Sequence, residues 1–234
     1  MFQTIFYQPI FNLIVFLYNS VSFNDLGVAI ILLILIIKLL FFPLSKKSIA
    51  SRKALADLQP KLDEIKKTYA GDKEAISRET LALYKDNKIN PFSSCLPLLI
   101  QFPFLIAIFR IFRDGVSGHM DLIYPFVHNP NTINNVSFGF LDLSLPNVYL
   151  AVLAGLAQFF QAKMMVSKQP EIKGNGSKDE NMTAIMSKQM MYFAPIITIF
   201  IGIKLPGGLT FYWFMLTIFT ILEQWLILKP RKNV

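Results

Sequence analysis

The sequence has little with which to build a metal site or a disulfide. Cys95 is its single cysteine, and its two histidines, His119 and His128, lie nine residues apart in a stretch rich in Gly, Asn and Pro. A single cysteine allows no internal disulfide and no thiolate cluster for a metal. The histidine pair is typical of loop surface. We therefore expect no metal or other cofactor and no enzymatic reaction.

Two long stretches also lack basic residues. Residues 1–25 and 115–146 contain no Lys or Arg, although the chain has 23 of them against 15 acidic residues and a net charge of +8. The basic residues gather in residues 45–90, 167–188 and 229–234. This alternation is the positive-inside pattern of membrane proteins. We interpret this pattern as a signal that sets the orientation of the protein in the membrane. We expect no direct recognition of nucleic acid by the basic residues.

Hydrophobic residues make up 53% of the chain, against about 45–50% in soluble domains, and they occur in blocks. Crossing a bilayer takes about 20 apolar residues, or fewer where the membrane is locally thin. We predict an all-α polytopic membrane protein with five transmembrane helices. The predicted spans are residues 26–44, 91–113, 147–166, 189–205 and 209–228.

The connecting segments give the expected orientation. If the basic segments are cytoplasmic, the N-terminus and the loop 114–146 lie outside, while the loop 167–188 and the tail 229–234 lie in the cytoplasm. Residues 1–25 lack the basic start and the small-residue cleavage site of a secretory signal. We expect them to form an amphipathic helix in the outer interface, with an uncleaved anchor as the alternative.

Residues 45–90 show helical spacing of apolar residues on both sides of a break at Ala70-Gly71-Asp72. This pattern predicts a cytoplasmic antiparallel helical hairpin. Pro60 should kink the first helix or lie near a break in it. The hairpin is either a charged, solvated connection between two spans or an arm that docks other molecules in the cytoplasm. The amino-acid composition fits both roles equally well.

The first predicted span contains one lysine, Lys38, within eighteen almost unbroken apolar residues from Leu26 to Pro43. A lysine near the middle of a membrane helix costs about 2.5–3.5 kcal/mol. It either snorkels to the headgroups or faces a hydrated cavity. Side chains tilt toward the helix N-terminus, which is outside in the expected orientation, so Lys38 leans away from the cytoplasm. We favour a hydrated cavity that attracts acidic groups of a ligand.

Glu223 in the last predicted span is the candidate counter-charge. Both spans run from outside to inside, and the depths of Lys38 and Glu223 differ by about 3 Å of helical rise. Two arrangements remain open. In the first, Glu223 forms an ion pair with Lys38 and weakens the attraction of Lys38 for an external anion. In the second, Glu223 does not face Lys38 and instead belongs to the cytoplasmic end of its own helix, beside Lys229. Gln101, flanked by prolines, is either a polar contact between helices or part of a functional site.

Five motifs are specific enough to compare with known families. The most specific is LALYKDNKINP followed by CLPLLIQFP, within residues 81–103. The others are YQPIFNLI, IIKLLFFPLSKKS, FGFLDLSLPNVYLAVLAGLAQFFQAKM and LPGGLTFYWFMLTIFTILEQ. They are distributed along nearly the whole chain, from Tyr7 to Gln224. They resemble the YidC-type membrane insertases, to which the mitochondrial Oxa and chloroplast Albino proteins are related.

The resemblance implies a protein that inserts other membrane proteins, alone or beside the Sec translocon. It implies a groove open to cytoplasm and lipid, to which Lys38, Gln101, Tyr212 and Trp213 contribute, with substrate helices moving past the third and fifth spans. Implied partners are newly made membrane proteins with short, often acidic extracellular segments, and membrane lipids. The Sec translocon, signal-recognition components and the ribosome are further candidates. The implied location is the bacterial inner membrane.

The sequence departs from the family at three points. The family usually has arginine in place of Lys38 and more often glutamine near Glu223, and Gram-negative members carry a large periplasmic domain that this sequence lacks. We expect a minimal form of the family. Two other functions remain open: a small transporter or channel that uses Lys38 and Glu223, and a passive scaffold for complex assembly. The sequence shows no inverted repeat, which disfavours a transporter.

Overall fold

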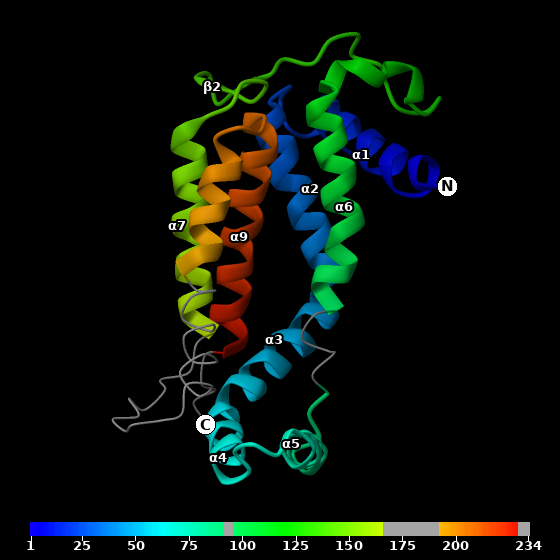
Figure 1. Ribbon diagram of the computed structural model, residues 1–234. Coiled ribbons are helices and arrows are strands. Elements are labelled where there is room, and N and C mark those ends of the chain that lie inside the picture. The colour runs from blue at the N-terminus through cyan, green and yellow to red at the C-terminus, as the bar shows by residue number, and fades with distance from the viewer. Residues whose placement is uncertain (91–95, 166–191, 229–234) are drawn as a thin grey trace, which may run out of the picture.

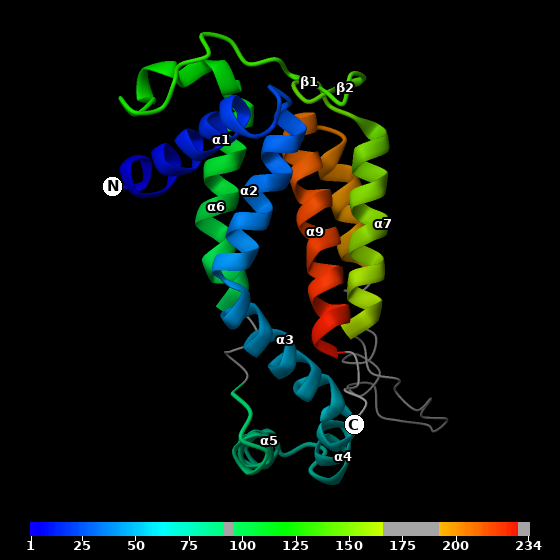
Figure 2. The same ribbon diagram turned by 180° about the vertical axis from the view of Figure 1, so that it is seen from behind.

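The computed structural model describes residues 1–90, 96–165 and 192–228, and it is mostly helical. Upright helices stand side by side in a bundle (Figure 1, Figure 2). They are α2 (Leu26–Leu40), α6 (Leu96–Arg113), α7 (Val148–Met165), the helix Tyr192–Gly202 and α9 (Gly207–Leu228). The predicted cytoplasmic loop 167–188 and tail 229–234 lie outside the described residues.

At one end of the bundle, the π-helix η1 (Gln3–Tyr7) continues into α1 (Gln8–Ser20), and the two lie across the direction of the upright helices, with the N-terminus at the side of the bundle (Figure 1). The buried face of α1 includes Phe11 and Ile14. Its polar residues contact the segment that follows α6: the amide nitrogen of Asn12 donates to the Leu122 carbonyl at 3.0 Å, and its oxygen accepts from the Tyr124 N–H at 2.6 Å. The polar groups of α1 are therefore used in tertiary contacts.

The first predicted span is not a single straight helix. After α2, the chain bends by 73° into α3 (Phe42–Asp57). Pro43 lies in the first turn of α3, and its missing N–H removes a bond that a continuous helix would make to Leu39. Residues 41–44, which the sequence assigned to the end of the span, therefore belong to the bend and to α3.

The chain continues through α4 (Gln59–Thr68) and α5 (Lys73–Asp86), which pack against each other beyond the end of the bundle. The break between α3 and α4 is at Leu58, and Pro60 occupies the first turn of α4, near a break as expected from the sequence. Asp72 caps α5 by accepting from the N–H groups of Glu74 and Ala75.

The segment after α6 covers the end of the bundle where α2 begins. It contains the 3-10 helix η3 (Val116–Leu122) and the antiparallel strands β1 (Val136–Ser137) and β2 (Leu141–Asp142). The Ser137 hydroxyl accepts from the Gly27 N–H at 2.7 Å, and Asp25 accepts from the Phe138 N–H at 2.6 Å. These bonds tie the strands to the first turn of α2.

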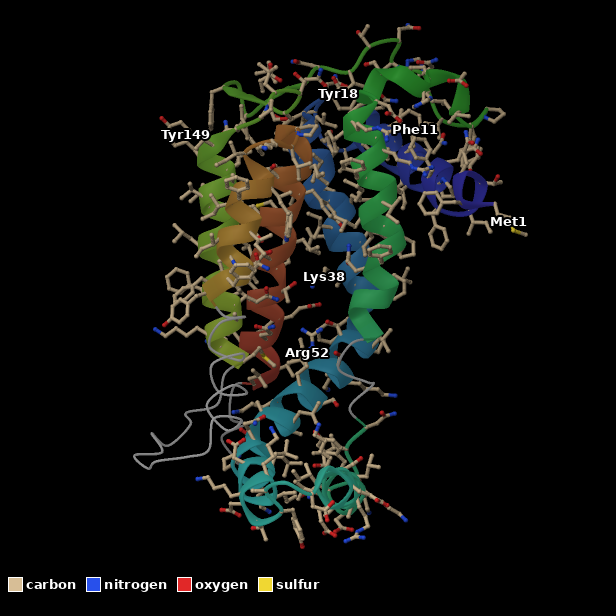
Figure 3. All side chains as sticks on the ribbon, in the orientation of Figure 1. Met1, Phe11, Tyr18, Lys38, Arg52 and Tyr149 are labelled. Carbon is tan, nitrogen blue, oxygen red and sulfur yellow. The ribbon has the colours of Figure 1, made fainter. Side chains whose placement is uncertain are left out.

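The buried core lies where α1, α2, α6 and the start of α9 meet, and includes Phe11, Leu33, Ile108 and Tyr212. By contrast, α7 and the helix Tyr192–Gly202 leave many apolar side chains exposed, as a lipid-facing surface does; Tyr149 at the start of α7 points away from the bundle (Figure 3). Among the described residues, α7 and α9 are each long and apolar enough to cross a membrane, and the bent pair α2–α3 adds a third if it forms one span.

Candidate functional site

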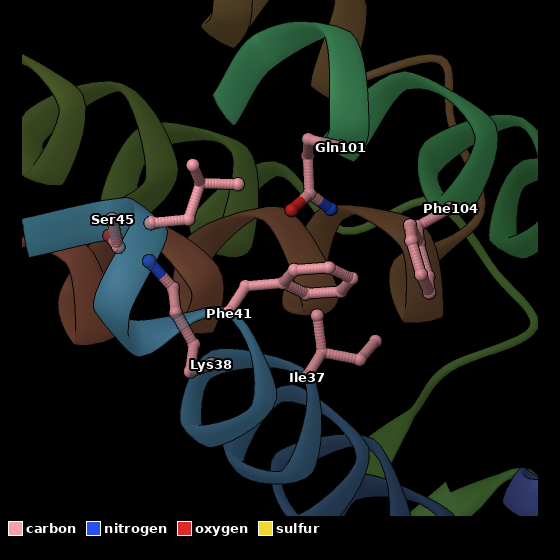
Figure 4. A pocket seen from close by; sticks show the side chains of 7 residues that line it. Ile37, Lys38, Phe41, Ser45, Gln101 and Phe104 are labelled. Atoms are coloured by element: carbon pink, nitrogen blue, oxygen red, sulfur yellow. The ribbon is translucent and has the colours of Figure 1, made fainter. Parts of the chain in front are cut away.

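A pocket opens inside the bundle at the bend between α2 and α3 (Figure 4). Its volume is about 50 Å³, and one water needs about 10–15 Å³ by the same measure, so it has room for a few water molecules. In the view of Figure 4, the ring of Phe41 lies between the side chains of Ile37 and Gln101, with Lys38 to one side. The lining residues are Ile37, Lys38, Phe41, Leu44, Ser45, Gln101 and Phe104.

Lys38 forms an ion pair with Glu223 across the α2–α9 interface. Its Nζ lies 2.8 Å from Glu223 Oε2, and the side chains of Lys38 and Glu223 are only 17% and 10% exposed. Figure 3 shows Lys38 in the interior of the bundle, close to the point where α3 leaves it. Of the two arrangements left open by the sequence, the structure has the ion pair.

Two hydroxyl groups complete this cluster. Lys38 Nζ also donates to Thr220 Oγ1 at 2.7 Å, and Ser45 Oγ donates to Glu223 Oε2 at 3.0 Å. An ammonium group has three donors, so two are used within the part of the chain that the structure describes and one remains for a ligand. Glu223 Oε1 is buried and has no hydrogen-bond partner among the same residues.

The local fold explains why a cation is stable at this position. Lys38 lies in the last turn of α2, where the unsatisfied carbonyl groups carry partial negative charge and favour a cation. The bend at Pro43 brings Ser45, in the first turn of α3, to the same carboxylate. Removing two charges from water costs several kcal/mol per ion, and only a close partner with further hydrogen bonds offsets that cost.

The predicted groove residues fall into three situations. Lys38 and Gln101 line the same pocket. Tyr212 is almost fully buried, and its hydroxyl accepts from the Gln101 amide nitrogen at 2.5 Å, so it connects to the pocket through Gln101. Trp213 is partly buried and is not one of the lining residues.

One wall of the pocket is aromatic. The rings of Phe41 and Phe104 are 5.9 Å apart and meet edge to face at 77°, a favoured geometry for aromatic pairs. The pocket therefore combines a paired cation and an amide with an apolar wall. Such a site suits a polar group carried on an apolar segment, since it offers polar contacts without full exposure to water.

Sequence reasoning did not identify Ser45, Thr220, Phe41 and Phe104 as parts of this site. A signal existed for Thr220, which is three residues before Glu223 and therefore on the same face of α9. A signal also existed for Ser45, which follows Pro43 closely and so lies just beyond the expected bend. The two phenylalanines gave no signal, because each lies in a long apolar stretch where every position looks alike.

Comparisons with known proteins show which sequences this chain resembles. Residues 16–233 match the model of the family described as 60Kd inner membrane protein. A protein of Fusobacterium nucleatum named membrane protein insertase YidC is 32% identical over 227 residues, which cover 95% of this chain and 97% of that protein.

Proteins with the same name in Rickettsia massiliae and Rickettsia akari are each 33% identical over 231 residues, which cover 95% of this chain but only 38% of theirs. The match thus extends over nearly the full length of one relative and over a minor part of the others. Because the family model covers most of the chain and the Fusobacterium relative matches it almost end to end, the chain belongs to the 60Kd inner membrane protein family, which includes the YidC membrane protein insertases.

Proposed function

We propose that this protein inserts other membrane proteins into the bacterial inner membrane, alone or beside the Sec translocon, without covalent chemistry. The observation that carries the proposal is the pocket in which Lys38 and Gln101 lie together within apolar helices. Membership of the family supports the same function, because its relatives carry the name membrane protein insertase. The substrates are newly made membrane proteins with short, often acidic extracellular segments.

The proposal includes a topology. Five spans, with the N-terminus outside and the C-terminus in the cytoplasm, account for the positions of the basic segments. The spans are α2 with the start of α3, α6, α7, the segment around Tyr192–Gly202, and α9. In this orientation α4 and α5 form a cytoplasmic hairpin that takes part in substrate handling. Their position beyond the α3 end of the bundle supports that assignment (Figure 1).

The polar segment of a substrate must cross the apolar interior of the bilayer, where each polar group without a hydrogen-bond partner costs several kcal/mol. A hydrated groove that contains the Lys38 pocket shortens this apolar path from the cytoplasmic side. A substrate carboxylate takes the free donor of Lys38 and competes with Glu223 for its charge. Release follows when the apolar substrate helix partitions into lipid, to which α7 and the Tyr192–Gly202 helix expose many apolar side chains.

The test uses a strain depleted of its own insertase, complemented with variants of this chain, and two substrates that differ only in having acidic or neutral extracellular tails. We expect Lys38→Ala to reduce insertion of the acidic-tailed substrate about fivefold or more, the effect of roughly 1 kcal/mol of lost attraction. Lys38→Arg should be tolerated, and Glu223→Gln should leave insertion intact or improve it.

A double variant separates function from folding. Lys38→Ala leaves a buried carboxylate unpaired, whereas Lys38→Ala combined with Glu223→Gln leaves no buried charge. We expect the double variant to accumulate in the membrane like the wild type and still fail with the acidic-tailed substrate. Normal insertion of that substrate by the double variant would exclude charge attraction by Lys38 as the mechanism.

A further inference from the structure

A second pocket lies at the opposite end of the bundle from α3–α5, where η1, the last turn of α6 and η3 meet. Its volume is about 200 Å³, room for a group several times larger than a water molecule. Gln3 and Tyr7 line it from η1, Arg110 and Arg113 from α6, and His119 from η3.

The two arginines of this pocket differ in their partners. Arg113 donates to the carboxylate of Asp114 from Nε at 2.7 Å and from Nη2 at 3.1 Å, and Asp114 is also 3.5 Å from His119 Nε2. The bond from Arg113 lowers the pKa of Asp114 below its usual value. Arg110 lies over the Phe2 ring, 5.1 Å from its centroid, and in the described parts of the chain no carboxylate lies within 4 Å of it. Its charge is not balanced by an ion pair.

Tyr7 supplies an unsatisfied donor in the same pocket. The residue is only 4% exposed, and its buried hydroxyl has no hydrogen-bond partner among the residues that the structure describes. Burial, assisted by Asp114 and Asp121, raises the pKa of Tyr7 to about 12, so the phenol stays protonated. A buried hydroxyl without a hydrogen-bond partner is unfavourable, and an acceptor in the pocket would remove that cost.

We propose that this pocket binds the phosphate group of a membrane phospholipid, with the Arg110 guanidinium and the Tyr7 hydroxyl as donors. A guanidinium matches the geometry of phosphate oxygens. Lipid is the expected source because the pocket lies at the end of the apolar helix α6 and beside exposed apolar residues of the N-terminal segment, Met1 and Ile5. The proposal does not depend on the insertase function.

The sequence supports this assignment from another direction. Apart from Asp114, the remaining walls of the pocket come from residues 1–25 and 115–146, which contain no Lys or Arg. Arg110 and Arg113 are therefore exceptions beside two segments without Lys or Arg, at an end of the bundle where Lys204 is a further cation. A bound phosphate gives a physical reason for that exception, since it neutralises a cation at the headgroup level of the membrane.

The test is native mass spectrometry of the purified full chain in detergent, after incubation with dioleoylphosphatidylglycerol. We expect Arg110→Gln to weaken retention of this lipid roughly tenfold, the usual effect of losing a charge-assisted hydrogen bond, and Tyr7→Phe to weaken it less. The matched control is Lys204→Gln. Lys204 also contacts an aromatic ring and precedes α9 at the same end of the bundle, but it lies outside the pocket, so this variant should retain lipid like the wild type.

Two further probes identify the recognised group. Dioleoylglycerol, which has no phosphate, should not be retained, and inorganic phosphate at millimolar concentration should not displace the bound phospholipid. Displacement by inorganic phosphate would overturn the lipid as the source and leave a site for the free anion. Equal retention by Arg110→Gln and wild type, or retention of dioleoylglycerol as strong as that of the phospholipid, would overturn the site itself. Unchanged retention of the phospholipid by Tyr7→Phe would show that the Tyr7 hydroxyl is not part of the binding site.

Discussion

Lys38 in the first pocket and Arg110 in the second have opposite electrostatic surroundings. Lys38 is mostly buried and lies 2.8 Å from Glu223, whereas Arg110 is exposed and has no carboxylate within 4 Å in the described chain. A buried charge without a partner costs several kcal/mol, while water solvates an exposed one at little cost. A ligand at Lys38 would therefore compete with the Glu223 carboxylate, whereas a ligand at Arg110 would meet no carboxylate within 4 Å among the described residues.

The largest expected effect comes from removing the buried cation alone. Lys38→Met leaves Glu223 buried and unpaired, and we expect it to lower the free energy of unfolding by about 3–5 kcal/mol. Arg110→Gln should cost only about 0.5–1 kcal/mol, the contribution of an exposed cation–π contact. Unfolding of the purified chain in detergent measures both. Equal losses would remove the distinction between the two pockets.

An intermediate effect is expected from Tyr212, which connects α9 to the Lys38 pocket through Gln101. Tyr212→Phe keeps the ring and deletes the buried acceptor at 2.5 Å from the Gln101 amide, so we expect a loss of about 1 kcal/mol. Tyr149→Phe is the control, because Tyr149 is 82% exposed and should change nothing. If thermal unfolding of both variants matches the wild type, the bond does not stabilise the pocket.

The smallest effect is expected at Lys53, which pairs with Asp57 one turn along α3. Its N–O distance of 2.7 Å is as short as that of the Lys38 pair, but both side chains are at least 40% exposed. Exposed pairs at this spacing contribute about 0.3–0.5 kcal/mol, and we expect Lys53→Ala to cost no more, with the difference vanishing at high salt. A loss comparable to that of Lys38→Met would show that distance, and not burial, determines the strength of these pairs.

The sequence predicted the depth of the Lys38–Glu223 pair but not its existence. Depth follows from helical rise, which is fixed for any helix. Whether two side chains face each other depends on how each helix is rotated in the bundle, which only tertiary packing decides. The same limit applies to Asn12: its bonds to Leu122 and Tyr124 join residues more than 100 positions apart, and no local pattern indicates such a contact.

The bend after α2 illustrates a different limit. Pro43 was visible in the sequence, yet an apolar block that continues to Leu44 predicts an uninterrupted span. A hydropathy profile depends only on how apolar the residues are, so it predicts a span that continues past the proline. The helix itself ends where the proline removes a backbone hydrogen bond. The number of spans stays a prediction, since the described residues contain two helices that meet the length and hydropathy of a membrane span, or three with the bent pair.

The central claim is that the Lys38 pocket receives the substrate. The most direct measurement is photo-cross-linking to a radiolabelled, acidic-tailed substrate during its synthesis, with benzoylphenylalanine placed at Phe104, which lines the pocket. The matched control is the same probe at Phe102, which is 57% exposed on the same helix and does not line it. We predict substrate adducts from position 104 and few from position 102. Equal yields from both positions, or none from position 104, would contradict the account.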